Sequence, residues 1–230
     1  MFGALEAIMF GRAIGIGMLG ATVVLLAGCA TNRSEILPAN PMTALATKPP
    51  TKGRTILIRS VSDDRVFAEQ SKDPSVPTLG SGGAAHATGE VKARAIGRKR
   101  NTFGQPMGDI LLERSATVAD IVQENVTAAL TEAGYKVTTN TADAGERPLV
   151  VDVRVKQFWE WFEPGFWALT LHVNIETNLE GLDLREALVA NVSTKHSYQA
   201  ASDDSWLEVL EEGLREYRGR LTALSSNLPP

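Results

Sequence analysis

The sequence has very little cysteine and no surplus of basic residues. A single cysteine among 230 residues excludes an intrachain disulfide, so the hydrophobic core alone must stabilise the fold. Lysine and arginine together number 23 against 27 aspartates and glutamates, which gives a net charge of −4. Proteins that bind nucleic acid usually carry a basic surplus, so nucleic acid is not expected as a partner. Hydrophobic residues make up 43% of the chain, which is typical of a globular protein.

An uncharged, mostly apolar run lies near the start of the chain, at residues 13–27. It is short for a transmembrane helix and has the length of the hydrophobic region of a signal peptide. The run ends in a sequence that resembles the lipobox of bacterial lipoproteins: Leu26, Ala27, Gly28 and Cys29. We therefore expect residues 1–28 to be removed and a diacylglycerol-type lipid to be attached to Cys29, the new first residue. An ordinary signal peptide or membrane anchor with an incidental cysteine is the alternative.

The residue after the cysteine bears on the destination of such a protein. In enteric-type sorting an aspartate at that position retains a lipoprotein in the inner membrane, and this chain has Ala30 instead. We therefore expect a lipid-anchored protein on the periplasmic face of the outer membrane, with the inner membrane as the alternative. The lipid on Cys29 is the only attached group expected, and no metal or other cofactor is predicted.

Residues 29–53 show no periodicity and contain four prolines, which predicts a lipidated, flexible tether. Residues 54–226 are predicted to form a single periplasmic domain. Within it, residues 62–92 are polar and rich in glycine, proline and serine, which indicates a long, mobile loop.

Two helices and a set of strands are expected in this domain. One helix begins near Thr117, which with Asp120 resembles a capping box, and ends at Gly134. The other begins near Asp203 and carries an apolar stripe with helical spacing. Together these elements predict an α+β fold, a twisted, mostly antiparallel sheet with both helices packed on one face. Strands are expected at 55–61, 135–139 and 186–198, with hairpins within 93–113 and 148–178.

The hairpin within 148–178 has the clearest alternation. Apolar residues occupy odd positions in both strands, which predicts one dry and one wet face. Directly opposed residues lie on the same face, so an odd-numbered residue must pair with another odd-numbered residue. An odd number of residues then separates the last pair, which excludes a four-residue turn. Pro164 disfavours a three-residue turn. We therefore expect a five-residue connection, Phe162–Phe166.

Several of these features resemble the YajG-like family of bacterial lipoproteins. They are the lipobox, the strand that ends in Asp63-Asp64-Arg65, the helix that closes in residues 133–137, the long hairpin, and the terminal strand and helix. The resemblance covers most of residues 54–224 and implies a lipoprotein with one α+β domain. It brings no catalytic motif, and members of the family are largely of unknown function.

The hairpin tip is the most distinctive candidate site because it is rich in aromatic residues. One interpretation is that these residues cover the end of the core, with Trp159, Trp161 and Trp167 on the dry face and Phe158 and Phe162 on the wet face. The other is an exposed patch that contacts a partner. Two flanking glutamates, Glu160 and Glu163, favour a protein or small apolar ligand over anionic lipid. The candidate contact residues are Trp159, Trp161, Phe162, Phe166 and Trp167.

A basic run is the second candidate site. It could hold phosphates of lipid A or of anionic phospholipids, or it could be a solvated cluster that protects a sheet edge. Its members are Arg94, Arg98, Lys99 and Arg100.

The sequence does not favour an enzyme. His172 and Glu176 lie about 13 Å apart along a strand and cannot share a metal. His196 with a nearby serine and Asp203 would make a hydrolase triad, but no G-x-S-x-G motif supports it. We expect a non-enzymatic binding or envelope-assembly module whose partner is an envelope protein or lipid. The alternative is a carrier or chaperone for a lipid or other apolar ligand, with a cavity lined by Trp159, Trp167 and Leu169.

Overall fold

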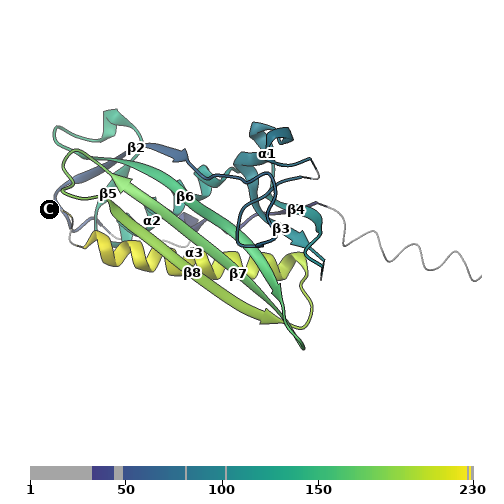
Figure 1. The fold of residues 1–230 in the computed structure, drawn as a ribbon. Coiled ribbons are helices and arrows are strands. Elements are labelled where there is room, and N and C mark those ends of the chain that lie inside the picture. Colours follow the sequence, from purple (N-terminus) through teal and green to yellow (C-terminus); the bar gives the residue numbers. More distant parts are fainter. Residues whose placement is uncertain (1–32, 44–48, 81, 102, 227, 229–230) are drawn as a thin grey trace, which may run out of the picture.

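The computed structural model describes residues 33–43, 49–80, 82–101, 103–226 and 228. The predicted signal peptide and Cys29 lie outside the described residues. The fold is α+β as predicted, with an eight-stranded mixed sheet and two long helices (Figure 1). No helix in the described ranges is both long and apolar enough to cross a membrane. The strands are β1 (Ser34–Ile36), β2 (Thr55–Asp63), β3 (Ala95–Arg100), β4 (Pro106–Leu112), β5 (Lys136–Thr138), β6 (Leu149–Pro164), β7 (Leu169–Glu180) and β8 (Leu188–Tyr198); the helices are α1 (Gly89–Arg94), α2 (Val118–Glu132) and α3 (Asp203–Ser225), with 3-10 turns η1 (Pro41–Thr43), η2 (Ala84–His86) and η3 (Thr141–Asp143).

The long strand β6 organises the sheet. One of its edges pairs antiparallel with β7, which in turn pairs antiparallel with β8. Two parallel strands share its other edge: β2 runs beside the first half, and β3 meets the second half where Gly97 lies opposite Glu160. β5 flanks β2, while β4 and then β1 continue outward from β3. The longest pairings, β6 with β7 and β7 with β8, are antiparallel, and all the parallel pairings lie on the side of β6 that carries β2 and β3.

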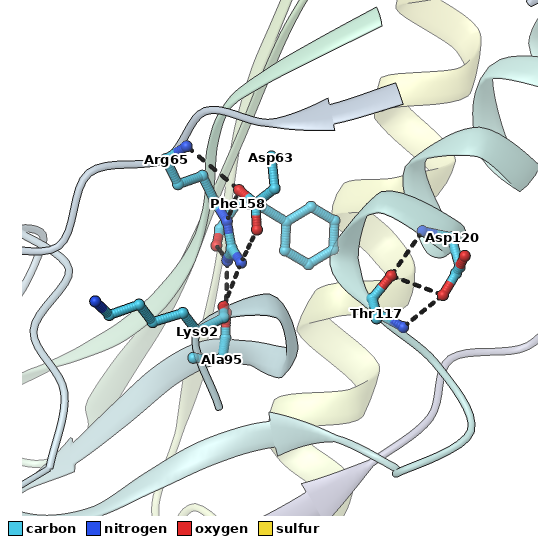
Figure 2. Close-up of polar contacts among 7 residues, drawn as sticks. All are labelled: Asp63, Arg65, Lys92, Ala95, Thr117, Asp120 and Phe158. Atoms are coloured by element: carbon cyan, nitrogen blue, oxygen red, sulfur yellow. Dashed lines mark hydrogen bonds and ion pairs between the residues drawn. The ribbon is translucent and has the colours of Figure 1, made fainter. Parts of the chain in front are cut away.

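Both long helices cover the same face of the sheet. α3 packs on β7 and β8, and α2 packs on β2, β6 and α3. Odd-numbered residues of β7, such as Val173 and Ile175, point into this main core, as the alternation predicts. The expected capping box of α2 is present, because Thr117 Oγ1 accepts from the Asp120 amide and Asp120 accepts from the Thr117 amide (Figure 2).

A β-bulge in β6 reverses the phase of the hairpin. Val155 lies opposite Thr177 and the next pair is Gln157 with Glu176, so Lys156 is an extra residue on its strand. Odd positions pair with odd positions before the bulge and with even positions after it. Pro164 therefore pairs with Leu169, and four residues, 165–168, connect the strands. The predicted five-residue connection, Phe162–Phe166, is wrong because the parity argument assumed an uninterrupted ladder.

The same bulge redirects the aromatic side chains of β6. Phe158 lies in the main core beneath the helices, and Phe162 packs against this core. The assignment of these two residues to a wet face is therefore wrong. Trp159 and Trp161 lie on the opposite face of the sheet.

The loop after β2 covers this second face of the sheet. Its Leu79 is fully buried in a smaller core with Trp159 and Trp161. The indole Nε1 of Trp159 donates a hydrogen bond to the carbonyl of Pro74, at 3.1 Å. The segment predicted to be a mobile loop is therefore a packed layer, and its last residues begin α1.

Arg65 closes the gap on the edge of β6 between the end of β2 and the start of β3. It is buried, and its guanidinium group donates hydrogen bonds to the carbonyls of Ala95 and Phe158 and to that of Lys92 (Figure 2). Asp63 accepts two further hydrogen bonds, at 2.7 Å each, and neutralises the charge. Arg65 thus supplies to the Phe158 carbonyl a donor that a continuous strand beside β6 would have supplied, and it ties this point of β6 to the end of α1 and the start of β3.

Part of the predicted tether belongs to the fold. Residues 34–36 form β1, which pairs in parallel with β4 from Ser34 opposite Ile110 to Ile36 opposite Leu112. Ile36 is buried in the main core, and η1 packs against α2. Residues 34–36 are therefore part of the same sheet as the domain that was predicted to start at residue 54. Of the predicted tether 29–53, residues 29–32 and 44–48 lie outside the described residues.

Candidate functional site at one end of the sheet

Three segments that are distant in sequence lie at one end of the sheet. β3 and β6 are parallel, so the turns that follow them, at 101–105 and 165–168, lie at the same end. β4 starts at this end and β1 runs parallel to it, so the described chain also enters the sheet here, at Ser34. Ser34 Oγ donates a hydrogen bond to Asp203 Oδ1, at the first residue of α3, over 2.7 Å. We call this the Ser34 end; Figure 1 shows it opposite the C-terminus.

The predicted aromatic tip divides into buried and exposed residues. Trp159 is fully buried and Trp161 nearly so, while Phe162 is partly buried with its ring 6.4 Å from that of Trp206. Phe166 and Trp167 in the turn are 89% and 86% exposed. Their rings contact edge to face, with centroids 4.7 Å apart. Of the five predicted contact residues, only these two form an exposed patch.

A third exposed aromatic residue lies at the same end. Phe103, in the turn between β3 and β4, is 88% exposed. Sequence reasoning missed it because a single phenylalanine among turn residues carries no periodic signal. The Ser34 end thus presents aromatic side chains from two different turns.

Glu160 does not contribute charge to this patch. It alternates with Phe158 and Phe162, so it lies on the helix-facing side of β6, and it is fully buried. Neither carboxylate oxygen has a hydrogen-bond partner among the described residues. Burial raises the pKa of Glu160 well above its usual range, which favours the uncharged acid. Of the two glutamates expected to flank the patch, Glu160 is therefore buried in the core, whereas the side chain of Glu163 is 59% exposed.

The predicted basic run is not one cluster. Arg94 Nε and Nη2 donate to the carbonyl of Leu112, and its guanidinium also binds Glu35 and Glu90. Lys99 binds Asp203, at 3.0 Å, and Ser34. Both side chains are thus occupied by structural contacts.

Arg98 and Arg100 remain together, on the other side of β3 from Lys99. Each donates to the same hydroxyl, Thr78 Oγ1, at 3.0 Å. Both line a cavity of about 760 Å³ between β3, the covering loop and the turn that holds Phe103. Two members of the predicted run therefore form a common site, and two do not.

Other predicted sites are not assembled. His196 Nδ1 lies 3.8 Å from Glu212, whereas Asp203 binds Ser34 and Lys99, so the hydrolase triad is absent as a unit. His172 stacks on Trp161 with ring centroids 5.0 Å apart. No group of three metal-binding side chains occurs in the part of the chain that the structure describes.

The predicted carrier cavity is not formed by the residues expected to line it. Trp159 is buried on the loop-covered face, while Trp167 is exposed in the turn. A different cleft, of about 460 Å³, lies between the sheet and the start of α3. Its apolar lining includes Leu169 with Phe162, Met107 and Trp206.

Comparisons with known proteins find distant structural likeness only. No known family model matches the sequence, and no curated protein matches it significantly. An uncharacterised protein of known structure aligns with 84% of this chain over 97% of its own length, at 10% sequence identity and a TM-score of 0.44. A Xanthomonas campestris protein of family DUF330 aligns with 84% of this chain over 92% of its own length, at 11% sequence identity and a TM-score of 0.38. A Neisseria meningitidis lipoprotein aligns with 39% of this chain over 78% of its own length, at 18% sequence identity and a TM-score of 0.22.

Identities and TM-scores this low carry no inference about the family or function of the chain. The resemblance to the YajG-like family stays a prediction.

Proposed function

We propose that this chain is a lipoprotein of the bacterial envelope, anchored by a lipid on Cys29 to the periplasmic face of the outer membrane. It acts without catalysis, by binding bilayer lipid through the Ser34 end. The observation that carries this proposal is the position of β1. Only four residues, 30–33, separate Cys29 from Ser34. A fully extended chain of that length spans about 18 Å, so a lipid on Cys29 holds the Ser34 end beside the bilayer.

The exposed aromatic residues support this orientation. Phe166 and Trp167 project from the end of the sheet where the chain enters it, and Phe103 lies in a turn at that end. Aromatic side chains are favoured at the boundary between lipid headgroups and hydrocarbon. A patch of two aromatic residues adds weak affinity, which is sufficient for a domain already confined to the surface.

Lipidation is tested by intact mass measurement of the full-length protein expressed in bacteria. The wild-type product should lose residues 1–28 and gain the mass of acyl chains and glycerol. Cys29→Ser should retain its signal peptide and gain nothing. Equal processing of the two proteins would exclude lipidation and the orientation inferred from it.

The membrane contact is tested by tryptophan fluorescence of the mature lipoprotein in vesicles of phosphatidylethanolamine and phosphatidylglycerol. Trp167 is the exposed tryptophan, since the other three are at most 6% exposed. Vesicles with brominated acyl chains should quench its emission strongly, and Trp167→Phe should abolish the effect.

Leu182 provides a matched control at the opposite end of the sheet. It is 98% exposed in the turn after β7. Leu182→Trp in the Trp167→Phe background should remain unquenched by the brominated lipid. If Trp167 itself is unquenched by that lipid but remains open to acrylamide, the bilayer contact is wrong, and an envelope protein becomes the better partner.

A carrier is the second candidate function, and the apolar cleft beside α3 favours it. The cleft borders Asp203 and therefore lies close to Ser34. Mass spectrometry of the purified protein under native conditions should then show a bound lipid that Trp206→Ala displaces. A ligand-free wild-type protein would exclude this candidate.

A further inference from the structure

Arg98 and Arg100 form an unusual pair of buried cations. They are only 7% and 8% exposed, although an arginine is rarely buried without an acidic partner. The hydroxyl of Thr78 accepts from both, which holds the two guanidinium groups side by side. The other acceptors are neutral carbonyls, of Gly80 for Arg98 and of Ser71 and Gly104 for Arg100.

The acidic groups nearby do not balance this charge. Asp109 lies 3.7 Å from Arg98 Nε, and it is shared with Arg33, at 3.6 Å, and with the amide of Gly80. Asp73 acts on Arg100 through its charge, but no acidic group forms an ion pair with Arg100 among the described residues. Burial lowers the pKa of Arg98, and burial with the neighbouring Arg98 charge lowers that of Arg100. A local positive excess therefore remains in a desolvated place, which is costly unless an anion joins it.

Both guanidinium groups keep hydrogen-bonding capacity that the surrounding protein does not use. The Nε atoms of Arg98 and Arg100 are buried and have no hydrogen-bond partner among the described residues. Each guanidinium group also has N–H bonds beyond those that the neutral acceptors occupy. Arginine in this arrangement is suited to the oxygens of a phosphate group.

The cavity is suited in size and position to a lipid headgroup. Its volume is about 760 Å³, and its lining adds Lys72 to the two arginines, with Glu69 as the opposing charge. Phe103, 88% exposed, also lines it, from the turn at the Ser34 end. A phosphate cavity bordered by an exposed aromatic side chain at the membrane-facing end matches the layering of a bilayer surface, where headgroups lie above the aromatic boundary.

We propose that Arg98 and Arg100 bind the phosphate group of an anionic phospholipid headgroup in this cavity. The choice of a lipid over free phosphate rests on the proposed function, because it depends on the Ser34 end facing the bilayer. The chemistry of the phosphate contact does not depend on it.

The test is isothermal titration of the full-length protein in a neutral detergent with three probes at constant ionic strength. They are dihexanoyl phosphatidylglycerol, dihexanoyl phosphatidylcholine and inorganic phosphate. We expect the anionic lipid to bind at least tenfold more tightly than either of the others. Equal binding of inorganic phosphate would overturn the lipid assignment, and the absence of binding by all three would overturn the site.

Variants locate the binding in the cavity. Arg98→Gln and Arg100→Gln should each weaken the binding of the anionic lipid at least tenfold. Arg59→Gln is the matched control, since Arg59 pairs with Asp152 on an exposed surface away from the cavity, and it should bind as the wild type does. Unchanged binding in the two cavity variants would contradict the proposal.

A milder variant covers the case in which a buried substitution unfolds the protein. Lys72 is exposed and lines the same cavity, so Lys72→Ala should fold and bind several-fold more weakly. Wild-type affinity in this variant would count against the cavity. Binding of the short-chain lipid with no quenching of Trp167 by brominated vesicles would keep the phosphate site and refute only the membrane orientation.

Discussion

Glu160 is a buried acid without a partner, and this determines how its charge affects stability. Its raised pKa means that the folded protein keeps the carboxyl proton at pH values where the unfolded chain has released it. The folded state then binds more protons, so the free energy of unfolding falls as pH rises from the usual glutamate range towards the raised pKa.

Glu160→Gln should therefore raise the free energy of unfolding at pH 7 to 8 and flatten its decline with pH. The gain should be about 1.4 kcal/mol for each unit by which the pKa of Glu160 in the folded protein exceeds its pKa in the unfolded chain. Only the part of this interval that lies below the pH of measurement contributes. Urea denaturation at pH 5, 6, 7 and 8 measures this, with Glu113→Gln on the exposed surface as the control. Parallel pH profiles for Glu160→Gln and wild type would show that Glu160 is ionised in the folded state.

Individual residues were predictable where strand alternation alone decides their neighbours. The spacing of Arg98 and Arg100 places them on one side of β3, and Lys99 on the other, so their separation from Lys99 could have been anticipated. Burial of Trp159 was one of the two interpretations, but the face on which it is buried could not be predicted, because it depends on the β6 bulge and on a loop with the composition of a mobile segment.

Among the elements, α3 is positioned by a close approach to β7. Gly213 lies where a Cβ would come within 2.5 Å of Val173 Cγ1. Small residues at such points let a helix pack closely on a sheet, and an added methyl group forces the two apart.

Gly213→Ala should lower the free energy of unfolding by about 1–3 kcal/mol, because overpacking outweighs the better helix propensity of alanine. Gly219→Ala is the matched control on the same helix, where a Cβ would meet nothing within 4 Å. That variant should gain up to about 1 kcal/mol from helix propensity. Urea denaturation distinguishes the two, and a stabilised Gly213→Ala would show that α3 does not press against Val173.

The two long helices, α2 and α3, and the longer strands followed from periodicity, whereas α1, the bulge and β1 did not. The bulge left a trace in the sequence: Lys156 and Gln157 are two successive polar residues where alternation allows one. β1 left none, since a three-residue strand has no period to detect and gains its stability from β4, far along the chain. Local sequence patterns therefore predicted most of the helices and strands, while long-range pairing determined on which face of the sheet each residue lies.

For the molecule as a whole, the proposed lipid anchor on Cys29 and its short connection to Ser34 should fix the orientation of the domain at the membrane. Inserting twenty Gly-Ser residues after Ala30 should leave lipidation intact and release the Ser34 end from the bilayer. Quenching of Trp167 by brominated lipid should then fall several-fold in the vesicle assay. Substitution of residues 31–33 by Gly-Ser-Gly, without lengthening, is the control and should quench as the wild type does. If the long insertion quenches equally, the aromatic patch holds the domain to the bilayer unaided.

In the proposed orientation, the course of α3 sets how far the protein reaches from the membrane. This helix starts beside Ser34 and ends at the opposite end of the sheet (Figure 1). Its 23 residues rise about 35 Å, so an upright domain would place its far turns about that distance from the bilayer. A lipoprotein held in this way would act close to its own leaflet, and a fluorescent protein fused after α3 would stand clear of the lipid surface.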